Sequence, residues 1–262
     1  MFGSTVDHFG PGPDEGPDDD GRMRRHTLHQ AASRVDDLTL REFSATEAKC
    51  VLAWWPGRIR RLQVVNLFAD PVPLSYDNFA IALTGRSDIS FLHVHTSAIG
   101  GTKWTPAVID ALRTSPPPIS VLHFRTRNLH SHDMEVISAL SSTLQRLHLA
   151  VDTSEIAPEL KLPVPLELPK LTTLKLELKH FQASEAATLE HLVAAFSSAP
   201  ITDLSIAAAW ASPKASLAII GNTFPTLRTI SLQPSALTAK DFTLVSAFCA
   251  RRGLAPLTHT PF

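Results

Sequence analysis

Three histidines recur at equivalent places in the middle of the chain, and imidazoles at regular spacing could bind a metal ion or take up protons. His93, His123 and His148 each stand between two apolar residues, and His95 and Arg125 follow two places after the first two of them. Imidazole nitrogens suit zinc, copper or nickel. On neighbouring strands, however, the outer two of the three rings would stand about 10 Å apart, and the sequence indicates no adjacent carboxylate to complete a site. We therefore expect no metal site.

Two interpretations of these histidines remain open. Neighbouring imidazoles disfavour each other's protonation, so the row could form a pH-sensitive contact surface. The simpler alternative is a set of polar side chains on a solvated sheet face, with no function of its own.

The sequence contains no motif typical of a catalytic site. A nucleophile elbow, a phosphate-binding loop, an HExxH pair and a nucleotide-binding glycine motif are all missing. His132 and Asp133 are adjacent where a helix is expected to start, a place where such residues ordinarily cap the backbone. Cys249 lies beside Phe248 within another expected helix and is more typical of a small buried residue than of a nucleophile. We expect neither an enzyme nor a cofactor.

Composition excludes several further classes of protein. Of the 262 residues, 44% are hydrophobic, so the chain can form a sizeable core. Its two cysteines, Cys50 and Cys249, fit neither a disulfide-rich secreted scaffold nor a cysteine-based zinc module. The net charge of −1 favours neither nucleic acid nor a membrane surface as partner, and no stretch is long enough to span a membrane. We expect a protein of the cytoplasm or nucleus.

The first 34 residues differ from the rest of the chain. Residues 1–20 contain six acidic residues, four Gly and three Pro, with no Lys or Arg. Such a segment buries too little apolar surface to offset the entropy of ordering it. A short basic cluster follows at Arg22, Arg24 and Arg25. We expect residues 1–34 to be a disordered acidic and basic tail. Because residues 1–20 carry −6 and the whole chain −1, residues 21–262 carry +5.

From about residue 35 onward, three apolar residues recur with the spacing L-x-x-L-x-L. The eight copies are Val35/Leu38/Leu40, Leu62/Val65/Leu67, Ile89/Leu92/Val94, Ile119/Leu122/Phe124, Leu144/Leu147/Leu149, Leu171/Leu174/Leu176, Ile201/Leu204/Ile206 and Leu227/Ile230/Leu232. Their third residues follow one another at intervals of 25 to 30 positions, which is typical of a repeat protein. Residues two apart on a strand point to the same side, so the last two apolar residues of each copy face a common core.

The residue between those two points to the opposite face of the sheet. In chain order these residues are Thr39, Asn66, His93, His123, His148, Lys175, Ser205 and Ser231. His95, Arg125, Ala150 and Glu177 would occupy the next position on that face. The histidines are therefore expected to lie on neighbouring strands.

Helix signals occupy most of the stretches between these strands. Thr105 and Ser212 each precede a Pro, which suits an N-cap followed by the first helical residue. Further helices are expected over 45–55, 75–84, 131–142, 185–196 and 239–252, the last ending at Gly253. Residues 150–170 contain four Pro and are expected to form a loop or an extended crossing.

The repeated motif, with phrases such as LPKLTTLKLEL, resembles the leucine-rich repeat family and in particular its ribonuclease-inhibitor-like branch. The resemblance covers residues 35–262. It implies an α/β solenoid of about eight degenerate repeats, with a curved parallel sheet on the concave face and helices on the convex face. The degenerate copies are similar to the repeat portion of fungal F-box proteins with leucine-rich repeats, although residues 1–34 could not form an F-box.

A protein of this kind is expected to be a non-enzymatic interaction module that binds a protein partner on its concave sheet. The side chains expected to contact the partner are His93, His95, His123, Arg125, His148, Lys175 and Glu177. This group is mildly basic, so the expected partner is an acidic loop or peptide. The alternative, implied by the resemblance, is the substrate-recognition component of a ubiquitin ligase that acts through an adaptor.

Overall fold

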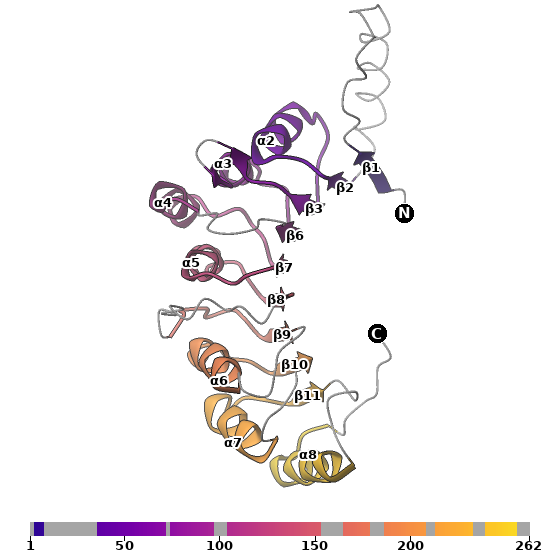
Figure 1. The fold of residues 1–262 in the computed structure, drawn as a ribbon, viewed down its shortest axis with the longest axis vertical. Coiled ribbons are helices and arrows are strands. Elements are labelled where there is room, and N and C mark those ends of the chain that lie inside the picture. The colour runs from indigo at the N-terminus through magenta and orange to yellow at the C-terminus, as the bar shows by residue number, and fades with distance from the viewer. Residues whose placement is uncertain are drawn as a thin grey trace, which may run out of the picture. The chain divides into compact units, whose positions relative to one another are not determined.

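The computed structural model describes residues 3–7, 36–71, 74–96, 104–152, 165–178, 186–207, 213–232 and 239–255. These residues form an α/β fold in which parallel strands alternate with helices, an arrangement consistent with a solenoid (Figure 1). The chain divides into two compact units, Met1–Ile119 and Ser120–Phe262. Within the described ranges, none of the helices has the length and apolar character needed to cross a membrane.

The first unit contains a parallel sheet with helices on one of its faces (Figure 1). Its strands are paired in the order β1 (Gly3–Asp7), β2 (Asp37–Arg41), β3 (Arg61–Leu67) and β6 (Phe91–Thr96). Its helices are α2 (Ala45–Trp54), α3 (Asp77–Thr84) and α4 (Pro106–Thr114), and β4 (Asp70–Pro71) pairs antiparallel with β5 (Leu74–Ser75). Strand β1 lies within the expected tail at 1–34, and residues 1–2 and 8–34 of that tail lie outside the described residues.

The second unit repeats the same plan. Its parallel strands follow the order β7 (Val121–Thr126), β8 (Arg146–Val151), β9 (Thr173–Leu178), β10 (Asp203–Ala207) and β11 (Thr229–Leu232). The helices α5 (Ser131–Ala139), α6 (Ala186–Ala195), α7 (Pro213–Thr223) and α8 (Ala239–Arg252) cover one face (Figure 1). Residues 165–170 contain no helix, as expected, and the rest of the Pro-rich crossing at 153–164 lies outside the described residues.

The apolar motif residues form the core beneath the helices. Strands β7 to β11 are paired in register, so that their second motif residues align from one strand to the next. This aligned row consists of Leu122, Leu147, Leu174, Leu204 and Ile230, and all five are buried. Fully burying one such side chain contributes roughly 1.5–3 kcal/mol to the free energy of folding. Because the neighbouring repeats provide this burial, each repeat is stabilised mainly by its contacts with them.

The second copy of the motif lies three residues earlier than expected. Leu62 aligns with Leu92, and Val64 aligns with Val94. Leu62 and Val64, and not Val65 and Leu67, are therefore the second and third motif residues of this copy. The first residue of the copy is then Ile59, which is fully buried. Spacing alone could not distinguish the two phases, because each places apolar residues at all three positions.

A bulge at the end of β3 explains why Leu67 is nevertheless buried. The pairing with β6 shifts between Val64 and Leu67, and Asn66 has a φ of 57°, in the left-handed region. The shift returns Leu67 to the core side of the sheet. Consequently Gln63, and not Asn66, occupies the position on β3 that aligns with His93.

The expected helices are present, with differences at their ends, and the expected cap Ser212 lies outside the described residues. Helix α4 begins at Pro106 and α7 at Pro213, and α8 ends before Gly253, whose φ is 63°. The Thr105 side chain makes no capping bond to α4; instead, the Thr105 amide donates to Asp77 Oδ1 at 3.0 Å. Helix α5 ends at Ala139, before the expected limit at residue 142.

The backbone bond that marks the start of each repeat recurs after α8. The Ala255 amide donates to the Arg228 carbonyl at 3.1 Å, just as Arg228 donates to Thr202 at 2.8 Å and Thr202 to Thr172 at 2.9 Å. Leu254 is buried at the place of a first motif residue. The predicted copies do not include Leu254, because His259 stands at the third position of the motif that would follow from it.

Candidate functional site

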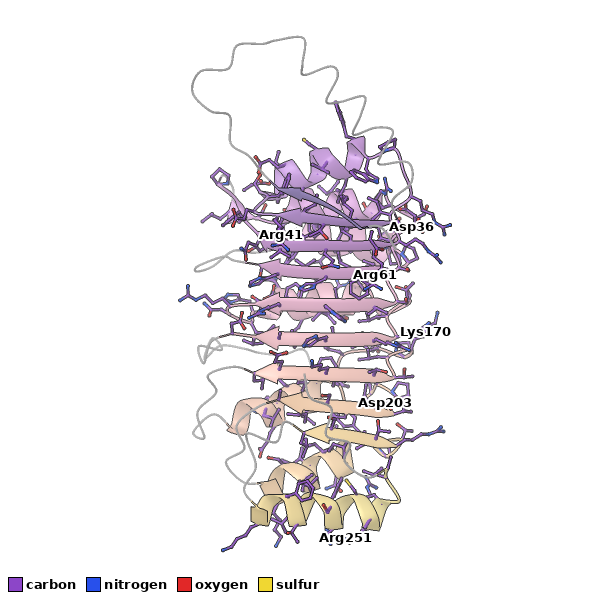
Figure 2. The ribbon with its side chains drawn as sticks, turned by 90° about the vertical axis from the view of Figure 1, so that its right-hand side faces the viewer. Asp36, Arg41, Arg61, Lys170, Asp203 and Arg251 are labelled. Carbon is purple, nitrogen blue, oxygen red and sulfur yellow. The ribbon has the colours of Figure 1, made fainter. Side chains whose placement is uncertain are left out.

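The sheet face opposite the helices, here called the open face, carries the predicted contact residues of the second unit. Alternate residues of β7, β8 and β9 point to it, and Figure 2 looks onto this side of the sheet. Strand pairing aligns His123 with His148 and Lys175, and it aligns Arg125 with Ala150 and Glu177. We refer to His123, Arg125, His148, Asp152, Lys175 and Glu177 as the face cluster.

Two of the predicted histidines lie side by side in this cluster. The rings of His123 and His148 are 5.2 Å apart between centroids, with an interplanar angle of 72°. This separation follows from the spacing of adjacent parallel strands, about 4.8 Å. The expected neighbouring placement is thus confirmed for this pair, whereas His93 belongs to the first unit.

Glu177 joins an imidazole to an ammonium group. His148 Nε2 lies 3.1 Å from Glu177 Oε2, and Lys175 Nζ lies 3.9 Å from the same oxygen. An ionised carboxylate only accepts hydrogen bonds, so the Nε2 nitrogen of His148 carries the proton of this bond. The expectation that no carboxylate neighbours the histidines was wrong, because Glu177 reaches diagonally across from the next strand.

A bidentate ion pair forms the other half of the cluster. Arg125 Nε donates to Asp152 Oδ2 at 2.7 Å, and Arg125 Nη2 donates to Asp152 Oδ1 at 2.9 Å. The hydrogen bond to Asp152 raises the pKa of Arg125; burial opposes this rise, and the charges of Asp152 and Glu177 add to it. Sequence reasoning did not place Asp152 at the site, and its only signal was its position directly after β8.

The face cluster is closer to neutral than the expected basic patch. Its cations Arg125 and Lys175 are matched by the carboxylates of Asp152 and Glu177. Ala150 lies between Arg125 and Glu177 in the strand register, and its short side chain leaves the two charged groups room to interact. The cluster therefore gains net positive charge only when its histidines take up protons.

The remaining predicted contact residues, His93 and His95, lie on β6 in the first unit. Both are half-buried and alternate with core residues, so they point to the open face of their own sheet. Close to the start of β6, the Arg61 guanidinium carbon lies 4.4 Å from the centroid of the Phe91 ring, and Arg61 is 3.9 Å from Asp37. This face thus combines imidazoles with a cation–π contact.

A second Arg–Asp pair, not anticipated from the sequence, lies in the first unit. Arg86 Nε donates to Asp88 Oδ1 at 3.0 Å and Arg86 Nη2 donates to Asp88 Oδ2 at 2.7 Å. Arg86 also donates to the carbonyls of Trp55 at 3.2 Å and Gly57 at 2.9 Å, and Asp88 accepts from the Ile59 amide at 2.6 Å. The pair therefore stabilises the loop that leads into β3.

The pKa of Asp88 reflects this environment. Burial would raise the pKa of the carboxyl group, but the hydrogen bonds from Arg86 and the Ile59 amide, with the charge of Arg86, hold it below the ordinary value. Asp88 is therefore ionised and bonded in the folded chain at neutral pH.

Three other side chains belong to types that are common in catalytic sites: Cys50, Cys249 and Asp133. Cys50 is exposed, whereas Cys249 is buried and its burial raises the pKa of the thiol, opposite to the shift that activates a nucleophile. Asp133 accepts from the His130 amide at 2.9 Å and so caps α5, as expected for this position. Across the described ranges, no group of three or more His, Cys, Asp and Glu side chains could hold a metal ion.

Comparison of the chain with models of known protein families and with curated proteins found no match. These comparisons show no family for the chain, and the evidence for its function is the geometry of the face cluster.

Proposed function

We propose that this chain is a leucine-rich-repeat-type interaction module, without enzymatic activity, that binds an acidic segment of a protein partner on the open face of its second unit. The observation that carries the proposal is the face cluster, in which charged side chains on an open sheet face form hydrogen bonds and ion pairs with one another. The side chains of Arg125 and Asp152 are 38% and 22% exposed, so a partner can reach both.

The repeat architecture supports this assignment. Strand and helix alternate with aligned leucine-rich rows beneath the helices, the plan that leucine-rich repeat proteins share. Each strand places alternate side chains on the open face, which allows several strands to contribute to one binding surface.

The contacts within the face cluster can be exchanged for contacts with a partner. The planar guanidinium of Arg125 binds any carboxylate of suitable geometry by two parallel hydrogen bonds, and Asp152 demonstrates this mode in the unbound chain. A partner carboxylate can bind the partly exposed Arg125 guanidinium in place of Asp152. Arginines in such positions are common among residues that dominate binding energy at interfaces.

Charge complementarity favours an acidic partner. Arg125, Lys175, His123 and His148 can all donate hydrogen bonds to anions, whereas the carboxylates of Asp152 and Glu177 can only accept. Residues 21–262 as a whole carry +5, which attracts an acidic segment at long range.

The proposal is tested with the full chain and a synthetic peptide rich in Glu and Asp. The variant His123→Ala/Arg125→Ala should bind this peptide at least about tenfold more weakly than the wild type, as expected for loss of an arginine that dominates an interface. Isothermal titration calorimetry measures the affinity, and circular dichroism verifies that the variant is folded.

The matched control is Arg251→Ala, which removes the same charge from the exposed end of α8, away from the sheet face (Figure 2). Its affinity should stay within about twofold of the wild type. Equal binding by the His123→Ala/Arg125→Ala variant and the wild type would show that the face cluster is not the binding surface.

A further inference from the structure

From the geometry of the face cluster we infer that it binds its acidic partner more tightly as the pH falls from about 7.5 to about 5.5, because His123 and His148 take up protons that the partner's carboxylates stabilise. The inference rests on the proposed function and adds to it the regulation of the same surface. Imidazoles in general take up protons between about pH 5 and 8, whereas Glu and Asp side chains of a peptide stay ionised there.

Among the described residues, the charged and titratable groups around His148 come from three strands. From β7 they are His123 and Arg125, from β9 they are Lys175 and Glu177, and from β8 and its end they are Arg146 and Asp152. With neutral imidazoles these groups nearly balance, with three cations against two carboxylates. Each proton taken up by an imidazole therefore shifts the face from near neutrality toward a positive charge.

Protonation also adds a hydrogen-bond donor. The neutral His148 ring donates to Glu177 through Nε2, so its Nδ1 nitrogen is an acceptor. A proton added at Nδ1 converts that acceptor into a donor and leaves the bond to Glu177 in place.

Without a partner, the Glu177 carboxylate favours a proton on His148, whereas a second proton, on His123, meets nearby positive charges. The ring of His123 lies 5.2 Å from that of His148, and Lys175 lies on the adjacent strand on the other side, so the positive charges would repel one another. A partner carboxylate relieves this repulsion. Because linkage is reciprocal, a partner that promotes proton uptake is bound more tightly when protons are abundant.

The test measures the affinity of the full chain for the same Glu- and Asp-rich peptide at pH 7.5, 6.5 and 5.5 and at one ionic strength. The wild type should bind about tenfold more tightly at pH 5.5 than at pH 7.5, which corresponds to uptake of about one proton on binding over part of this range. The His123→Gln/His148→Gln variant should lose this gain, and each single variant should lose part of it.

His191→Gln is the matched control, because His191 is an exposed histidine on α6, a helix of the opposite face. This variant should keep the full gain in affinity. A gain that persists in the His123→Gln/His148→Gln variant would overturn the inference.

The outcomes separate this inference from the proposed function. Binding that depends on Arg125 but has the same affinity at all three pH values would overturn the proton linkage and leave the proposed function standing. Absence of peptide binding at every pH, or tighter binding of a Lys-rich peptide, would overturn both.

Discussion

Two Arg–Asp pairs, one in each unit, have nearly identical geometry but different surroundings. Arg86 with Asp88, and Arg125 with Asp152, each form two parallel bonds from Nε and Nη2 at 2.7–3.0 Å. They differ in what else they contact. The first pair also holds loop carbonyls and an amide, whereas the described bonds of the second pair join side chains on an open sheet face.

The difference shows that a bidentate pair does not reveal its role by itself. The Arg86 and Asp88 side chains are only 16% and 19% exposed, so either partner left alone would be a charge in a largely buried place. Arg125 itself, with 38% of its side chain exposed, is more accessible than Arg86, so a carboxylate of a bound partner can reach it. One pair therefore supports the fold, and we assign the other to binding.

The largest expected effect is on the stability of the first unit. Arg86→Ala should lower the free energy of unfolding by about 2–4 kcal/mol, because the Asp88 carboxylate keeps the Ile59 amide as a donor but loses the guanidinium, which two loop carbonyls lose as well. Arg125→Ala should lower it by no more than about 1 kcal/mol, as is usual for partly exposed pairs. Urea denaturation followed by circular dichroism measures both values. Equal losses in the two variants would show that both pairs are structural.

A smaller effect is expected on stability in acid. The pKa of Asp88 in the folded chain lies below its ordinary value, so the unfolded chain binds this proton more readily as the pH falls. The stability that Asp88 contributes is therefore present at neutral pH. It is lost as the pH falls through the pKa of Asp88 in the folded chain. Asp88→Asn should therefore be less stable than the wild type at pH 7 and lose less stability between pH 5 and pH 3.

The measurement is a series of urea denaturation curves across this pH range. If the variant and the wild type lose stability in parallel as the pH falls, Asp88 does not contribute through its charge, and the structural half of the comparison fails.

The repeats were predictable because they follow a short local rule. Apolar residues two apart on a strand reach the core, and the in-register rows of β7 to β11 reproduce that rule. The rule failed at β3, where Val64 and Val65 offer two apolar phases and the choice depends on pairing with β2 and β6. It also failed to show the repeat start at Leu254, which the backbone bond of Ala255 reveals.

The open face was predictable in its membership but not in its contacts. Alternation placed His123, His148 and Glu177 on one side of the sheet, but the contact between His148 and Glu177 is diagonal and depends on side-chain direction across two strands. Asp152 lies beyond the end of β8, where alternation no longer applies. The bonds of Arg86 to loop carbonyls follow no sequence period, so no pattern could indicate them.

The most direct test of this division of roles is the affinity of Asp152→Asn for the Glu- and Asp-rich peptide at pH 7.5, measured beside Asp88→Asn. The first variant removes the carboxylate that occupies Arg125 and should bind the peptide about threefold or more tightly than the wild type. The second removes the same charge from the structural pair and should leave the affinity of the folded chain unchanged. Weaker or equal binding by Asp152→Asn would mean that Asp152 positions Arg125 rather than occupying its binding site, and would contradict the account.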